Sequence, residues 1–155
     1  MCAFRMARLE KELHEMICNR TRPEGSLDPG SRFHVMNVPE AARNNTDFRR
    51  AVWTGQHLQM TLMSIPVRGD VGAEMHPDVD QLLRVEAGQA LVRSGNCQND
   101  FSNAKMLQPG DVVFVPAGTW HNVENCGGCA LQLSSVYAPP QHPRGIVHRA
   151  KAEAE

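Results

Sequence analysis

The stretch GDVVFVPAGTWHNVEN, residues 110–125, carries most of the information about the fold of this chain. It opens on a turn signal, continues through the apolar run 112–115, which favours a buried strand, and reaches a second tight turn at Pro-Ala-Gly, residues 116–118. In the strand that follows, alternation places His121 and Val123 on one face and their neighbours on the other. The stretch therefore predicts two short strands joined by a tight turn, with a histidine and an apolar residue sharing a face.

Similar turn signals divide the rest of the chain from residue 33 onward. Twelve Gly and ten Pro supply them, which favours β structure over a helix bundle. We expect strands at residues 33–36, 50–54, 58–65, 72–76, 81–85, 90–93, 104–107, 112–115, 120–124 and 130–137. Many short strands at roughly even spacing are typical of a β-sandwich or a β-barrel, so the predicted fold class is all-β.

The segments on either side of the strands have different patterns. Residues 6–19 carry apolar side chains at three- and four-residue steps, which predicts an amphipathic helix. This helix could cover a sheet or serve as a docking or dimer helix, and both interpretations stay open. A linker rich in Pro, Gly and Ser follows at residues 22–31. We therefore divide the chain into an N-terminal helix and linker (1–32), a barrel (33–138) and a polar C-terminal arm across the surface (139–155).

Composition and charge argue against several classes of protein. Lys and Arg number 16 against 17 Asp and Glu, a formal net charge of -1, so we expect no nucleic-acid partner and no membrane partner. No apolar stretch is long enough for a membrane span, and no apolar block follows the charged N-terminus, so a cytoplasmic location is expected. The five Cys are odd in number and irregularly spaced, which favours reduced thiols over a disulfide scaffold.

The fixed residues of 110–125 follow the order Gly, five residues, Pro, one residue, Gly, two residues, His, three residues, Asn. This order matches the second signature motif of the cupin superfamily. The first cupin motif runs Gly, five residues, His-x-His, three or four residues, Glu, six residues, Gly, and residues 69–88 resemble it in altered form. Counting back from Gly88 puts Gln81 at the Glu position. The resemblance covers about residues 33–138 and implies a double-stranded β-helix, or jelly roll.

Alternation and the resemblance together indicate candidate metal ligands. The resemblance implies that His121 is a ligand inside the barrel, and that His76 stands at the first His position with Asp78 at the second. An outward-facing Arg84 turns Gln81 inward, where its amide oxygen is a plausible ligand. Three residues share one face of the preceding segment: Glu74, His76 and Asp78.

Two His and a carboxylate suit Fe(II), Mn, Ni or Zn, with positions left for water or substrate. We therefore predict a divalent metal site made of His76, Gln81, His121 and Asp78. Asp78 is as well explained as a turn residue that caps its own backbone, and Asp80 is expected mainly as such a residue.

The resemblance is to small single-domain cupins, near the mannose-6-phosphate isomerase-like cupins of unknown reaction. It implies the fold and a metal but no single reaction, because cupins include several kinds of enzyme and pure binding domains. Our first hypothesis is a metal-dependent enzyme, isomerase-like or dioxygenase-like, that acts on a small polar metabolite. The alternative is a non-enzymatic module that binds a metal or small ligand. A redox sensor through Cys126 and Cys129, which we expect to face each other across a two-residue hairpin turn, ranks last. Exposed sheet edges favour a homodimer, with residues 1–32 or the strand near 50–54 in the contact.

Overall fold

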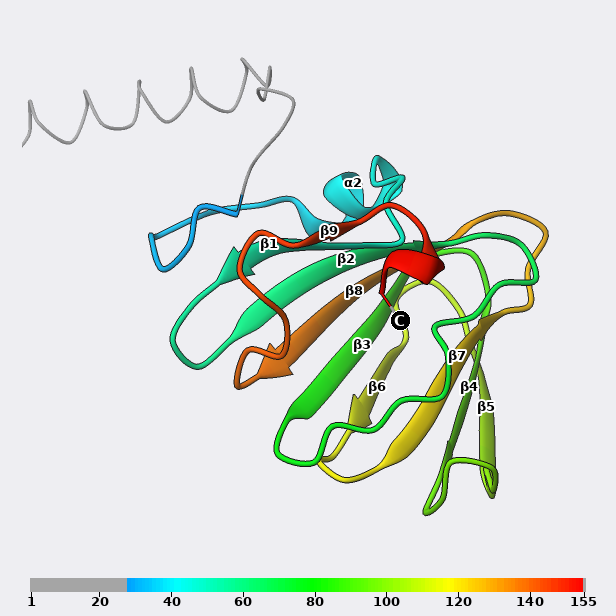
Figure 1. The fold of residues 1–155 in the computed structure, drawn as a ribbon. Coiled ribbons are helices and arrows are strands. Elements are labelled where there is room, and N and C mark those ends of the chain that lie inside the picture. Colours follow the sequence, from blue (N-terminus) through cyan, green and yellow to red (C-terminus); the bar gives the residue numbers. More distant parts are fainter. Residues whose placement is uncertain (1–27, 155) are drawn as a thin grey trace, which may run out of the picture.

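The strands predicted from the turn signals form two antiparallel sheets that face each other (Figure 1). The computed structural model describes residues 28–154. One sheet has six strands in the order β6-β3-β8-β2-β1-β9, and the other has three in the order β5-β4-β7. The strand bounds are β1 Arg49–Thr54, β2 Gln59–Ile65, β3 Asp80–Ala87, β4 Ala90–Gly95, β5 Asn103–Leu107, β6 Val112–Val115, β7 Trp120–Asn125, β8 Leu131–Ala138 and β9 Val147–His148. The all-β, double-stranded β-helix fold class is thereby confirmed.

Two of the predicted strands take another form. Residues 33–36 have no regular structure, and the chain instead enters the short helix α2 (Val38–Arg43). Asn37 caps this helix by accepting a hydrogen bond from Glu40 N at 3.1 Å, and a Pro in the first turn also favours a helix start over a strand. Residues 72–76 form no continuous strand and pair with β7 through one isolated bridge, Glu74 with His121. Gly72 precedes this bridge with a φ of 96°, which interrupts the extended backbone.

The apolar core lies between the two sheets. Its buried members are Phe48, Met63, Ile65, Leu83, Val85, Ala90, Val92, Val115, Val123, Leu131 and Leu133. A second, smaller cluster of Ala42, Val52 and Leu62 forms where α2 packs on the large sheet, against β2, β3 and β8. Because β2 is covered on both faces over part of its length, its residues are buried almost continuously rather than in strict alternation.

The strand register divides the inner face of the six-stranded sheet into an apolar and a polar half. The apolar row across β3, β8 and β2 consists of Val85, Leu133 and Met63. At four residues from this row in each strand, towards the other end of the sheet, the same face carries a polar row of Gln81, Tyr137 and Gln59. A row of Leu83, Ser135 and Thr61 lies between the two. We call the part of the interior lined by Gln59, Thr61, Gln81, Ser135 and Tyr137 the polar half. All five side chains are buried, so they need polar partners there.

Two residues of the C-terminal segment, Val147 and His148, join the large sheet as its edge strand. In the expected arm, residues 139–155, strand β9 pairs antiparallel with β1, with Arg49 opposite His148, and the 3-10 helix η1 (Lys151–Glu153) follows. The helix predicted at residues 6–19 and most of the linker lie outside the described residues. Within residues 28–154, no helix has the length and apolar character needed to cross a membrane.

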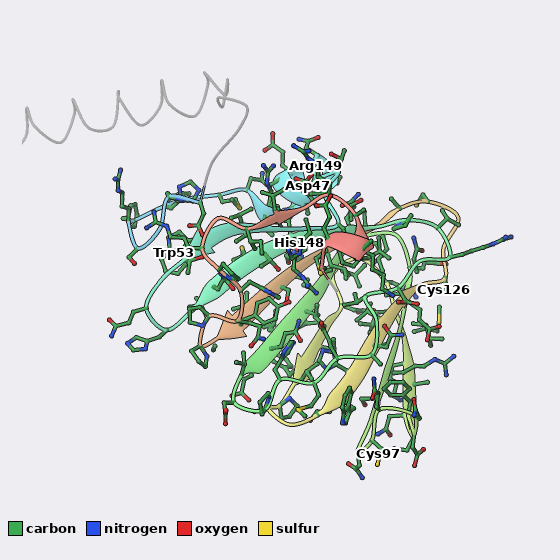
Figure 2. The ribbon with its side chains drawn as sticks, viewed as in Figure 1. Asp47, Trp53, Cys97, Cys126, His148 and Arg149 are labelled. Atoms are coloured by element: carbon green, nitrogen blue, oxygen red, sulfur yellow. The ribbon has the colours of Figure 1, made fainter. Side chains whose placement is uncertain are left out.

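The hairpin expected at residues 126–129 is wrong. Strands β7 and β8 belong to different sheets, so this segment connects one sheet to the other and its two cysteines do not face each other across a ladder. Asn125 shapes the connection: its Nδ2 donates to Cys129 O at 2.8 Å and its Oδ1 accepts from Gly127 N at 2.9 Å. Figure 2 shows Cys126 at this connection and Cys97 at the tip of the β4–β5 hairpin. The cysteines of the described residues, Cys97, Cys126 and Cys129, are exposed and have free thiols.

Candidate metal centre

The segment before β3, residues 69–76, is held against β7 by backbone hydrogen bonds. Glu74 and His121 exchange two of them, each 2.9 Å long, and Gly118 N donates to His76 O at 2.8 Å. Directly opposed residues of an antiparallel pair project to the same side, and residues two apart share a face. The backbone therefore places Glu74 and His76 beside His121.

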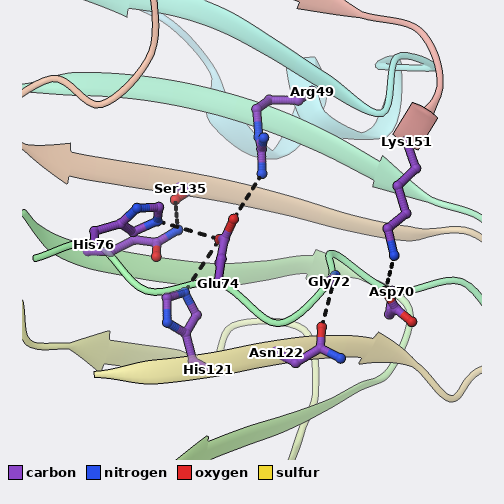
Figure 3. Close-up of polar contacts among 10 residues, drawn as sticks. Arg49, Asp70, Gly72, Glu74, His76, His121, Asn122, Ser135 and Lys151 are labelled. Carbon is purple, nitrogen blue, oxygen red and sulfur yellow. Dashed lines mark hydrogen bonds and ion pairs between the residues drawn. The ribbon is translucent and has the colours of Figure 1, made fainter. Parts of the chain in front are cut away.

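Three potential metal ligands converge at this point. The ligand atoms of Glu74, His76 and His121 all lie within 4.8 Å of one another. Nε2 of His76 lies 3.6 Å from Glu74 Oε1, and Nε2 of His121 lies 3.4 Å from the same oxygen (Figure 3). Both Nε2 atoms are buried and have no hydrogen-bond partner in the protein. Two imidazole nitrogens and a carboxylate oxygen are a donor set that divalent zinc, iron, manganese and nickel accept.

The imidazole of His121 is oriented by a neighbouring backbone carbonyl. Its Nδ1 lies 3.0 Å from Thr119 O. Because a carbonyl oxygen can only accept, Nδ1 must carry the proton in this contact, and the neutral ring then presents a lone pair at Nε2. This arrangement is typical of metal-binding histidines, whose second nitrogen is held by a hydrogen bond.

Glu74 stands between the two imidazoles and Arg49 (Figure 3). Its Oε1 faces the rings, and its Oε2 accepts a hydrogen bond of 3.4 Å from Arg49 Nη2. Burial by itself raises the pKa of Glu74, but contacts with His121 and His76 and the charge of Arg49 outweigh it, so the pKa lies well below its ordinary value. Glu74 is therefore a carboxylate near neutral pH and supplies the one negative charge of the cluster.

Gln81 and Asp78, the other ligands predicted from the sequence, differ in their surroundings. Gln81 is buried, and its Nε2 donates to Ser135 Oγ at 3.0 Å, which leaves Oε1 buried without a protein partner. Asp78 is exposed and lies outside the group of converging ligand atoms. Asp80 accepts a hydrogen bond of 3.0 Å from Ala117 N, as expected of a turn residue.

Glu74 is the candidate ligand that the set predicted from the sequence left out. If the four-residue spacing of the first motif is used, Glu74 takes the place of the first His, His76 that of the second, and Gln81 keeps the Glu position. The opening glycine of the motif then falls on Arg68, whose φ of 63° lies in the left-handed region that glycine favours. The sequence signal for this alignment is the four-residue spacing between His76 and Gln81, because the shared face alone does not separate Glu74 from Asp78.

Unpartnered polar atoms gather around the same site. Within the described part of the chain, the buried side-chain atoms without a protein hydrogen-bond partner are Arg49 Nε, Thr61 Oγ1, His76 Nε2, Gln81 Oε1, His121 Nε2, Tyr137 Oη, His142 Nε2 and His148 Nδ1. They belong to the ligand cluster, to the polar half, or to residues directly beside them. Buried polar groups in folded proteins are nearly all paired, so a concentration of unpaired ones indicates a binding site.

A row of aromatic rings links the cluster to the C-terminal segment. The ring centroids lie 5.7 Å apart for His121 and His76, 5.7 Å for His76 and Tyr137, and 4.9 Å for Tyr137 and His142. Burial, followed by the negative charge of Glu74, raises the pKa of Tyr137. Burial, followed by the positive charge of Arg49, lowers the pKa of His142 to about 4. Both side chains are therefore neutral at pH 7.

Known proteins with similar sequences and structures identify the family. A family model described as "Cupin domain" matches residues 61–137. The chain is 46% identical over 127 residues to the uncharacterized protein YrkC of Bacillus subtilis (strain 168), which covers 82% of this chain and 68% of that protein. It is 35% identical over 118 residues to the uncharacterized protein L612 of Acanthamoeba polyphaga mimivirus, with 76% and 72% covered. The crystal structure of BH2720 from Bacillus halodurans has 50% sequence identity and a TM-score of 0.81, with 83% of this chain and 97% of that chain covered. With its two motifs, its paired sheets and these relatives, the chain belongs to the cupin family.

Proposed function

We propose that this cupin is a metal-dependent enzyme that acts on a small polar metabolite. Glu74, His76 and His121 hold a divalent ion in this proposal, and Gln81 Oε1 is a fourth donor. The convergence of three ligand atoms within 4.8 Å carries the proposal. Such an ion supplies Lewis acidity or, if it is iron, oxygen-activating chemistry.

Two neutral side chains beside the cluster favour an enzyme over a binding module. Tyr137 Oη and His142 Nε2 are buried and unpaired, so each can hold or accept a proton close to a bound molecule. A non-enzymatic module with the same metal site would return its bound metabolite unchanged. Mass analysis of small molecules after incubation with the metal-loaded protein separates these two functions.

Elemental analysis tests the metal centre itself. We expect about one divalent ion per chain in protein purified without chelator, and its loss in the Glu74→Gln and His121→Ala variants. Asp78→Ala and Glu124→Gln are the matched controls, because Asp78 is exposed and Glu124 lies on β7 in an ion pair with Arg93. Full occupancy in Glu74→Gln together with loss in Asp78→Ala would restore the ligand set predicted from the sequence, and metal-free wild-type protein would refute the proposal.

The reaction type, the subfamily, the cellular location and the oligomeric state predicted from the sequence remain part of this proposal. The isomerase-like and dioxygenase-like functions differ in oxygen consumption, which an oxygen electrode measures on the metal-loaded protein with a substrate. The resemblance to mannose-6-phosphate isomerase-like cupins belongs to the isomerase-like form of the proposal. A cytoplasmic location accords with the free thiols of the described cysteines, and the homodimer is tested below.

A further inference from the structure

The charges around the metal centre do not balance when a divalent ion is bound. Glu74 is the one carboxylate of the ligand cluster, and Gln81, which stands at the Glu position of the motif, contributes no charge. Arg49 adds a positive charge on the other side of Glu74 and is only 5% exposed. The ion and Arg49 together outweigh Glu74. An excess of positive charge in a protein interior is costly unless an anion compensates it.

Arg49 has hydrogen-bonding capacity to spare for such an anion. Its guanidinium group offers five N–H donors, but its contacts among residues 28–154 are one hydrogen bond of 3.4 Å from Nη2 to Glu74 and the ring of Phe48 at 5.8 Å. Its Nε is buried and unpartnered. A planar guanidinium group matches the two oxygens of a carboxylate, so a carboxylate is the anion that Arg49 binds best.

Two further donors face the same region. The Tyr137 hydroxyl is completely buried, and His142 packs edge-on against its ring. The His142 backbone is held by Gln59, which accepts from His142 N at 2.9 Å and donates to His142 O at 2.9 Å. Glu74 contacts Arg49 at 3.4 Å and His76 at 3.6 Å, and the ring of His76 lies 5.7 Å from that of Tyr137. Because Tyr137 packs in turn on His142, the three side chains gather on the side of Glu74 that faces the polar half.

We propose that Arg49, Tyr137 and His142 form a subsite for the carboxylate of a small organic acid, and that a second oxygen of this acid reaches the metal. The contact between the acid and the metal rests on the function proposed above. Because Glu74 contacts the ligand imidazoles through Oε1 and Arg49 through Oε2, the metal and the subsite flank one carboxylate. A short acid with an oxygen next to its carboxylate, such as a 2-hydroxy acid, therefore fits both.

Calorimetric titration of the full chain loaded with manganese tests the subsite. The probes are glycolate, a 2-hydroxy acid, and glycolamide, its neutral counterpart of the same shape. We expect glycolate to bind at least about tenfold more tightly, since a charged acceptor strengthens the hydrogen bonds from Arg49 and Tyr137. Arg49→Met and Tyr137→Phe should each lower the affinity for glycolate about tenfold or more. The affinity for glycolamide should change by less than about twofold. Arg50→Met is the control, because Arg50 lies on the same strand, pairs with Asp47 and should leave both affinities unchanged.

Metal content is measured in every sample, so that a failure of the metal site and a failure of the subsite are distinguished. Equal binding of the two probes to the metal-loaded chain would overturn the subsite, and so would an equal weakening of both by Arg49→Met, since that would show that Arg49 only supports Glu74. If the wild-type chain takes up no metal, the proposed function fails and the same titrations on the metal-free chain decide the inference. A preference for glycolate that depends on Arg49 then supports the subsite, and no preference refutes it.

Discussion

Replacing Tyr137 by Phe should stabilise the metal-free protein, although the same change weakens binding of the acid. The ring stays buried in its contacts with His76 and His142, and only a hydroxyl without a protein partner is removed. A buried polar group without a partner costs about 1–3 kcal/mol. Because the hydroxyls of Ser135 and Thr61 lie near enough to affect the pKa of Tyr137, we take the lower end, about 1 kcal/mol. For a chain of this size, that raises Tm by about 2–4 °C.

The assay is thermal and urea unfolding followed by circular dichroism, with a chelator present. Ser134→Ala is the matched control, because Ser134 is also buried on β8 but its hydroxyl donates to Glu86 Oε1 at 2.6 Å. Removing that paired hydroxyl should destabilise the protein by about 1–3 kcal/mol, which is the opposite sign. If Tyr137→Phe destabilises the metal-free protein as Ser134→Ala does, the hydroxyl is well paired in the folded state and the reasoning about the polar half is refuted.

Three further outcomes are expected. Gln81→Glu should bind a divalent ion more tightly in a titration of the metal-free protein, since a carboxylate carries more negative charge than an amide oxygen, and an unchanged or weaker affinity would show that Gln81 is not a ligand. Since the folded-state pKa of His142 is about 4 and the unfolded value is 6.5, protonation favours the unfolded state. The contribution of neutral His142 to the free energy of unfolding is present above pH 6.5 and is lost as the pH falls towards 4. In urea unfolding measured across this range, His142→Gln should make stability depend less on pH. An unchanged pH dependence would contradict the burial of the ring. Light scattering on the full chain should show a homodimer, and a strictly monomeric chain would exclude it. If a chain that starts at Ser31 is still dimeric, residues 1–30 are not needed for the contact.

The face on which a side chain lies could be predicted wherever a strand shows alternation. His121 and Val123 share the buried face of β7, and Gln81 is buried while Asp80 is exposed, as the two-residue period requires. Alternation is a local property of the backbone and needs no knowledge of which strands pair. It fails for residues 126–129, because a Gly-Gly turn looks the same whether the next strand returns to its own sheet or crosses to the other.

The sequence by itself determined the fold class, the turn before His121 and the inward faces of His121 and Gln81. Only the tertiary structure decided which carboxylate joins the histidines, because Glu74 and Asp78 share a face and are separated by where the segment pairs with β7. It also brought Arg49 and His142 to the site from β1 and from the C-terminal segment. These residues carry no motif, and β9, with two residues, is too short to show a period. Their proximity follows from sheet order and register, which result from contacts between segments far apart in the chain.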